Sequence, residues 1–232
     1  MRRRFLSVLT AASALAGIMG ITEAAHAATM KYTTAYDGGY TDIINEPLSI
    51  QKFDSSLGTL DSVTIDFIGD IKGDAGFENR SPQASTVTVD LSGDLKLELA
   101  DGTSVAEFSP RQDYSYDVAK YDDTTDFGGT SGKTVEGLTA SQSDTKTYTD
   151  NTLLQSFTGS GDLDLLFSAT AKSTVSGSGN IASYVTTYAK SNVEVTYGYQ
   201  PRKVPEPSAI LGIGVMTGVG LLVQRNRSLS KA

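Results

Sequence analysis

Apolar and polar residues alternate along most of the chain between residues 28 and 201. A side-chain period of two is typical of strands with one buried face, and the helical period of about 3.6 is nearly absent here. The alternating runs occupy residues 63–71, 87–91, 95–99, 163–168 and 193–199. In the first run, the residues expected to point inward are Val63, Ile65, Phe67 and Ile71.

Turn-forming residues separate the runs. Glycine beside Asp, Asn or Ser favours tight reversals of the backbone. Such groups occur at residues 37–39, 101–102, 128–129, 131–132 and 176–180. We interpret 87–91 and 95–99 as strands paired around Ser92-Gly93-Asp94, and 120–146 as a long polar loop with room for one short strand. Many short strands separated by such turns predict an all-β fold, an antiparallel β-sandwich of the jelly-roll-like or Ig-like type.

The N-terminus, residues 1–27, has the three parts of a secretory signal peptide. Arg2-Arg3-Arg4 is followed by an apolar region from Phe5 to Ile21 and by the small-x-small sequence Ala25-His26-Ala27. We predict cleavage between Ala27 and Ala28. The arginines lack the longer polar lead-in of a twin-arginine signal, so general secretion is favoured over that route.

The C-terminus, residues 202–232, combines a proline motif, an apolar run and a basic tail. The motif is Val204-Pro205-Glu206-Pro207 (204–207), and the uncharged run extends from Ala209 to Val223 (209–223). A membrane-crossing helix needs about 20 residues, with a lower limit near 17, which this run only just reaches. We predict a single transmembrane helix, because the alternative, a buried core helix, would show a polar face.

The basic residues that follow the span lie within residues 224–232. They are Arg225, Arg227 and Lys231. Because positive charge is retained on the cytoplasmic side of a membrane, these residues are expected to stop transfer there. The body between the two signals, residues 28–201, is then expected outside.

The motif, the single span and the Arg-containing tail resemble the PEP-CTERM sorting signal of Gram-negative bacteria. The resemblance implies that Pro205, Glu206 and Pro207 are recognised by exosortase, a membrane-embedded cysteine protease or transpeptidase, which removes the span after export. Two prolines, each with a φ of about −65°, would hold Glu206 on a stiff, extended backbone. The implied partners are signal peptidase, exosortase and, transiently, the inner membrane, before release to the cell surface or a biofilm matrix.

The body resembles the choice-of-anchor E domain of bacterial surface proteins. The segments that carry this resemblance are residues 53–60, 63–64, 78–79, 126–132, 157–161 and 193–199. The resemblance implies a β-rich surface domain that is used with alternative C-terminal anchors, PEP-CTERM among them. It implies no catalytic residues.

The composition of the body excludes several classes of function. Of 19 Lys and Arg residues, eight lie outside 28–201, leaving 11, and of 27 Asp and Glu residues two lie outside, leaving 25, so the body carries a net charge of −14. Such a domain repels nucleic acid and anionic lipid. The one histidine, His26, lies in the leader, and the chain has no Cys and no Trp. Ser-His-Asp and Cys-His catalysis, imidazole or thiolate zinc sites and disulfides are therefore excluded.

Carboxylates leave two kinds of site open in the body. Asp122, Asp123 and Asp126 could bind calcium through oxygen ligands, although their spacing is not that of an EF-hand and acidic turn residues are common. Asp162 and Asp164 lie two apart on a predicted strand, hence on one face, and could act as an acid–base pair. A solvated strand face explains the second pair more simply.

Tyrosines could stack on sugar rings or pack across strands. The ones of interest are Tyr114, Tyr116, Tyr121, Tyr184, Tyr188, Tyr197 and Tyr199. The interpretation we favour is an exported, non-enzymatic surface or matrix protein with no cofactor. The alternatives are a module that binds extracellular polysaccharide and a carboxylate-based hydrolase.

Overall fold

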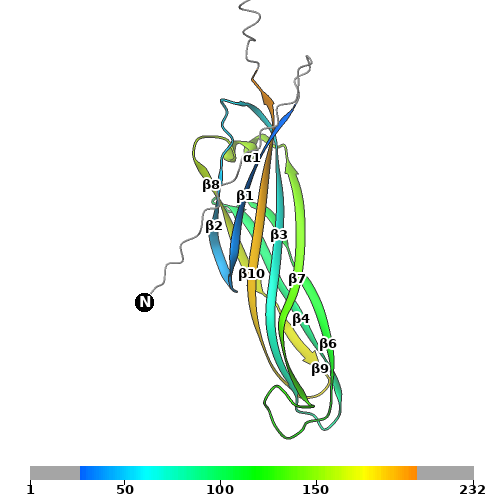
Figure 1. Ribbon diagram of the computed structural model, residues 1–232. Coiled ribbons are helices and arrows are strands. Elements are labelled where there is room, and N and C mark those ends of the chain that lie inside the picture. The colour runs from blue at the N-terminus through cyan, green and yellow to red at the C-terminus, as the bar shows by residue number, and fades with distance from the viewer. Residues whose placement is uncertain (1–26, 203–232) are drawn as a thin grey trace, which may run out of the picture.

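The structure is a computed structural model that describes residues 27–202, and it consists of two packed antiparallel sheets (Figure 1). The first sheet has the order β1-β10-β3-β7, and the second has the order β2-β8-β4-β5, with β6 and β9 also pairing with β4. The strands are β1 (Ala28–Tyr40), β2 (Ile43–Gln51), β3 (Gly58–Asn79), β4 (Ser85–Leu99), β5 (Ser104–Phe108), β6 (Arg111–Val118), β7 (Gly132–Tyr148), β8 (Asp162–Ala171), β9 (Thr174–Gly177) and β10 (Ile181–Pro201). Within the described residues there is one short helix, α1 (Asn151–Ser156). The prediction of an all-β, antiparallel sandwich is confirmed.

Strand β3 is the centre of the first sheet. It pairs with β10 from Gly58 to Asn79 on one side and with β7 on the other. Its alternate residues Val63, Ile65, Phe67 and Ile71 are at most 1% exposed, as the pattern of the sequence predicts. They pack against the second sheet, so the core lies between the two layers.

Glycines allow the two layers to approach closely at β3 and β4. A Cβ at Gly73 would lie 2.5 Å from Leu91 Cδ1 and 3.1 Å from the carbonyl oxygen of Thr186. A Cβ at Gly93 on β4 would lie 2.9 Å from Ile71 Cδ1. Close packing of this kind leaves no room for an added methyl group. These glycines are therefore part of the strands and do not mark turns.

The expected pairing of 87–91 with 95–99 is wrong, because both runs belong to the continuous strand β4. At Ser92 and Gly93 the strands that pair with β4 are exchanged. The residues before this point pair with β6 and β9, and the residues after it pair with β8 and β5. Since both parts of the strand have partners elsewhere, they do not fold back on each other.

The expected loop over 120–146 is correct only as far as residue 131. Residues 132–148 form β7, which lies at an edge of the first sheet and pairs with β3. Its polar residues face solvent, and Val135, Leu138 and Ala140 are buried. The group Asp37-Gly38-Gly39 likewise lies inside β1, at an irregularity of register with β10. Several strands are consequently much longer than the expected short strands.

Tyr197 is the largest side chain that is fully buried in the core. Its hydroxyl donates a hydrogen bond to the carbonyl oxygen of Gln51 at 2.9 Å, which links β10 to the end of β2 in the other sheet. Burial, followed by the neighbouring Tyr32, raises the pKa of the Tyr197 phenol well above its usual value. The neutral phenol is therefore the form that the folded state stabilises.

We expect Gly73→Ala to lower the free energy of unfolding by about 1–3 kcal/mol, because the new methyl group would overlap with Leu91 and press on the Thr186 carbonyl. Thermal denaturation followed by circular dichroism measures this change. Gly128→Ala is the matched control, because its nearest neighbour would be Asp126 Oδ1 at 3.4 Å. Equal melting temperatures for the two variants would contradict the close approach of the sheets.

We expect Tyr197→Phe to change how stability depends on alkaline pH. In the wild type the raised pKa of Tyr197 contributes stability that is complete below about pH 10, the usual tyrosine value, and is lost above it. The variant should be less stable by about 1 kcal/mol at neutral pH, because the bond to Gln51 is gone. Urea denaturation from pH 7 to pH 11 should then show a smaller decline for the variant. A parallel decline in both proteins would argue against a neutral buried phenol.

Candidate functional site

Two ends of the elongated molecule hold its irregular segments (Figure 1). The terminal end contains α1 and both described ends of the chain, since Ala28 pairs with Tyr199. The distal end contains the loop of residues 119–131 and the turn of residues 178–180. Each end brings together segments that are far apart in the sequence.

At the terminal end, the segment after β2 is held by the segment after α1. The N–H of Phe53 donates to Phe157 O at 2.8 Å, and the N–H of Gly159 donates to Phe53 O at 3.0 Å. Both phenylalanine rings are fully buried. The segments 53–60 and 157–161, which are about a hundred residues apart in the sequence, are therefore in direct contact.

The C-terminal end of β10 is fastened to the same loop. Arg202 N–H donates to Leu57 O at 3.0 Å, directly after the last pair between Pro201 and Gly58. A side chain at Gly58 would overlap with the backbone carbonyl of Gln200, so glycine is required there. The backbone is thus held in place up to Arg202.

One carboxylate of this loop has a perturbed pKa. The pKa of Asp54 is lowered from its usual value, mainly by the backbone N–H of Ser56, then by the Ser56 side chain, and more weakly by the Arg202 guanidinium. The N–H of Ser56 lies 2.8 Å from Asp54 Oδ1. This is the geometry of a turn that stabilises an ionised side chain.

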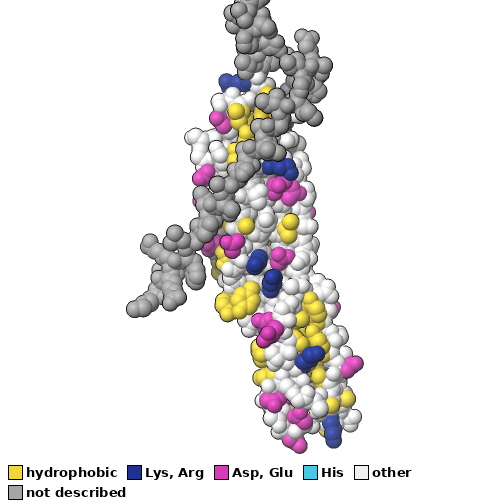
Figure 2. Space-filling model, in the orientation of Figure 1, with side chains coloured by type: hydrophobic (Ala, Val, Ile, Leu, Met, Phe, Trp, Pro, Cys, Tyr) yellow, Lys and Arg dark blue, Asp and Glu magenta, His cyan; other side chains and the backbone are white. Residues whose placement is uncertain are grey.

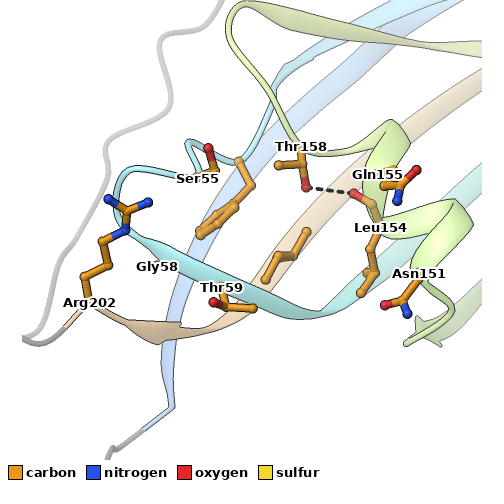
Figure 3. A pocket seen from close by; sticks show the side chains of 10 residues that line it. Ser55, Gly58, Thr59, Asn151, Leu154, Gln155, Thr158 and Arg202 are labelled. Carbon is orange, nitrogen blue, oxygen red and sulfur yellow. Dashed lines mark hydrogen bonds between the residues drawn. The ribbon is translucent and has the colours of Figure 1, made fainter.

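A pocket of about 380 Å³ opens beside the place where the segment after β2 contacts the segment after α1 and the end of β10 (Figure 3). It is lined by Phe53, Ser55, Gly58, Thr59, Leu60, Asn151, Leu154, Gln155, Thr158 and Arg202. Arg202 is the one charged residue in the lining, and the Thr158 hydroxyl donates to Leu154 O at 2.8 Å. The lining therefore provides hydrogen-bonding groups and apolar surface, but no paired acid and base for catalysis.

At the distal end, a buried glutamate holds the loop of residues 119–131. Glu78 is fully buried, and its carboxylate accepts hydrogen bonds from the Ser131 hydroxyl and from the N–H of Phe127, the latter at 3.0 Å. Gly132 lies so close that a side chain there would overlap with this carboxylate. A buried carboxyl group without such partners would destabilise the fold.

Asn79, the next residue, is also fully buried and satisfies three more backbone groups. Its amide nitrogen donates to Gln83 O and Ala119 O, both at 2.8 Å, and its amide oxygen accepts from Ser81 N–H at 3.0 Å. Glu78 and Asn79 together join the end of β3 to the loop. Sequence reasoning missed this cluster, because alternation places Glu78 on a solvent face that the loop covers.

The carboxylates proposed for calcium do not converge. Asp122 Oδ1 accepts from Thr124 N–H at 3.1 Å, and Asp126 Oδ1 accepts from Gly128 N–H at 3.0 Å. The first of these bonds is the main reason that the pKa of Asp122 is lowered. Asp123 has a positive φ of 68°, which is a turn conformation. Within residues 27–202 no group of three acidic side chains could hold a metal ion, so the calcium prediction gains no support.

The carboxylates proposed for hydrolysis lie on an exposed strand face. Asp162 and Asp164 are both exposed on β8, and the Asp164 carboxylate accepts a hydrogen bond from the Ser49 hydroxyl of β2. Neither aspartate lines the pocket beside α1 or the pocket formed by residues 51–55 and 159–161. Asp164 and Ser49 thus form a cross-strand polar pair, which does not involve Asp162.

The tyrosines divide into packing and exposed groups. Tyr199 packs against Phe53, Tyr116 against Phe77, and the Tyr114 hydroxyl both accepts from Thr139 N–H and donates to Thr139 O. Tyr114 thereby satisfies backbone groups on the open edge of β7. The Tyr121 hydroxyl bonds to Thr125 within the distal loop. Tyr184 and Tyr188, by contrast, lie on the outer face of the first sheet.

Most residues of the predicted processing signals lie outside the described residues. These are Ala25, Val204, Pro205, Glu206, Pro207, the span from Ala209 to Val223, Arg225, Arg227 and Lys231. Ala27 is exposed and precedes the first strand, which begins at Ala28. Of the part that the structure describes, no helix has the length and apolar character needed to cross a membrane.

Comparisons with known proteins identify no family. No family model matches the chain, and no curated protein matches it. Two solved structures of infectious bursal disease virus are similar, its T13 viral particle at 13% identity and a TM-score of 0.20, and its VP2 subviral particle at 14% and 0.24. Each comparison covers 86% of this chain and respectively 47% and 49% of the viral chain, so the chain spans about half their length. At these TM-scores the likeness carries no argument about fold or function.

We expect Asn79→Ala to destabilise the protein by about 2–4 kcal/mol, because it leaves the buried Ser81 N–H and the part-buried carbonyl oxygens of Gln83 and Ala119 without their partner. Hydrogen exchange should become faster in residues 119–131 before the rest of the sheet is affected. Asn192→Ala, on the exposed face of β10, is the matched control and should change little. Unchanged exchange in the loop would show that Asn79 does not hold it.

Proposed function

We propose that this chain is an exported, non-enzymatic protein of the cell surface or extracellular matrix, sorted through its C-terminal Pro-Glu-Pro motif. Signal peptidase would remove residues 1–27, and exosortase would recognise residues 204–207 and remove the span that follows. The body between them is the β-sandwich, whose jelly-roll-like or Ig-like subtype remains a prediction. The observation that carries the proposal is the position of the two chain ends.

Both ends leave the sandwich from adjacent strands at the terminal end (Figure 1). β1 begins at Ala28 and β10 ends at Pro201, directly inside the two predicted signals. A leader at one terminus and a membrane span at the other can both reach one membrane surface through short links only if the two termini leave the domain on the same side. Paired antiparallel strands about 5 Å apart satisfy this requirement.

The link between the fold and the motif is short. The backbone is hydrogen-bonded up to Arg202, and the motif begins at Val204, so one residue separates them. At about 3.3–3.6 Å per residue, the motif begins within roughly 7 Å of the folded surface. A processing enzyme in the membrane would therefore meet the terminal end of the sandwich as well as the motif itself.

We expect the mature protein from cells that contain exosortase to lack residues from Ser208 onward, and Glu206→Ala to retain them. The reason is that the carboxylate between the two prolines is the charged group of the recognition element. Intact-mass spectrometry of the purified protein, from cells with and without exosortase, measures this difference. Glu136→Ala, an exposed glutamate of β7, is the control and should be processed normally. A complete tail in both kinds of cell would overturn the proposed sorting.

A further inference from the structure

The outer face of the first sheet carries two exposed aromatic positions. At the first of them, Tyr40 on β1 lies opposite Tyr188 on β10 in register, with ring centroids 4.2 Å apart. Tyr40 is 65% exposed, because its ring rests on Tyr188 and has no further cover. The neighbouring Tyr40 side chain, followed by burial, raises the pKa of Tyr188 to about 12. The two stacked rings together form the first aromatic position.

The second position is Tyr184 on β10, which lies across a glycine. Its cross-strand partner is Gly76, and a Cβ there would lie 2.6 Å from Tyr184 Cζ and would overlap with the ring. The glycine thus lets the ring lie down on the sheet and cover the backbone. Because Tyr184 is still 43% exposed, one ring surface is available to a ligand.

Phe127 fixes the second position from the side. Its ring meets Tyr184 edge to face, at a centroid distance of 5.1 Å and an interplanar angle of 87°. The buried carboxylate of Glu78 holds the Phe127 N–H at 3.0 Å, and Phe127 adopts a φ of 55°. The buried cluster at the distal end therefore acts as a positioning element for this aromatic position.

Hydrogen-bonding side chains occupy the face between the two positions. Tyr184 and Tyr188 are four residues apart on one strand, and at about 3.3 Å per residue they are separated by roughly 13 Å. Lys72 is the cross-strand partner of Tyr188, and Asp74 is the partner of Thr186 between the tyrosines. Thr186 and Asp74 therefore place a hydroxyl and a carboxylate at a level between the two rings, and the exposed Lys72 lies beside Tyr188, on the side away from Tyr40.

The apolar area of this face is too small and too divided for a stable protein partner. Tyr40 and Tyr184 together expose on the order of 200 Å², since a whole aromatic side chain offers about 150–250 Å². Ile68 on β3, which is 47% exposed on the same face, adds part of one aliphatic side chain. A stable protein interface buries about 800 Å² on each partner. Figure 2 shows separate hydrophobic patches on the visible face, among polar side chains. A ligand that contacts each ring singly and bonds to polar groups between them fits this pattern.

The net charge of the body indicates whether that ligand is neutral or charged. The body carries a net charge of −14, so its overall field repels an anionic polymer. Sugar rings with equatorial hydroxyl groups have flat C–H faces that stack on aromatic rings and hydroxyls that bond at the rim. A monosaccharide cannot contact both positions, whereas an extended oligosaccharide can.

We propose that the outer face of the first sheet is a binding site for a neutral, extended polysaccharide, which stacks on Tyr40 and Tyr184 and bonds to the polar groups between them. Tyr188 supports the first ring, and Phe127 supports the second. The site lies on the folded body and does not depend on how the tail is processed, so it can fail or succeed independently of the proposed sorting.

Calorimetric titration of the purified full-length protein with cellohexaose and xylohexaose tests the site, with an oligomer of alginate as an anionic probe. We expect at least one neutral hexasaccharide to bind and the alginate oligomer not to bind. Tyr184→Ala and Tyr40→Ala should each raise Kd by about tenfold or more. Tyr184→Phe, which keeps the ring, should stay within about twofold of the wild type.

Ile44→Ala is the control, because Ile44 is 76% exposed on β2 in the second sheet and should leave Kd unchanged. Circular dichroism checks that each variant is folded. If Tyr184→Ala unfolds, Tyr40→Ala decides the outcome, because the Tyr40 ring does not cover a glycine in the way that Tyr184 covers Gly76. Absence of binding to both neutral probes, or equal Kd values for the tyrosine variants and the wild type, would overturn the proposal. A dimer in light scattering that Tyr40→Ala abolishes would also overturn it and assign the face to a second copy of the chain.

Discussion

The antiparallel pairing of β3 with β10 is the interaction on which the rest of the structure depends. These two strands are 22 and 21 residues long, and they pair from one end of the molecule to the other. Each backbone group that this ladder satisfies would otherwise be exposed or buried without a partner. β1 and β7 attach to its two sides, and the terminal and distal ends are built from the loops that meet where the two strands finish.

Close approach of the sheets is the second constraint. The inward residues of β3 include glycines as well as large apolar side chains, and the side chains of β4 fill the space that those glycines leave. Packing density of this kind tolerates little change of volume in either direction. The same use of glycine on the outer face, at Gly76, has a different result, because it places an aromatic ring on the surface instead of in the core.

The part of the fold that could be predicted from the sequence is the part encoded by local alternation. Val63, Ile65 and Phe67 lie inside as expected, and the antiparallel sandwich is confirmed. The predictions were wrong where one local sequence pattern is compatible with two different structures. Glycine within β4 resembles a turn, and the Ser- and Thr-rich β7 resembles a loop, because an edge strand needs few apolar residues when its backbone is paired along one side.

The sequence by itself determined the class of fold, the acidity of the body, the absence of His and Cys chemistry in it, and two candidate processing signals at its ends. Only the tertiary structure decided which tyrosines serve packing and which face solvent, and that Glu78 and Asn79 hold a loop forty or more positions away. The physical reason is the separation along the chain of the residues that interact. Alternation and turn chemistry depend on neighbours in the chain, whereas burial, cross-strand partners and the satisfaction of buried polar groups depend on segments that meet only after the sheets have formed.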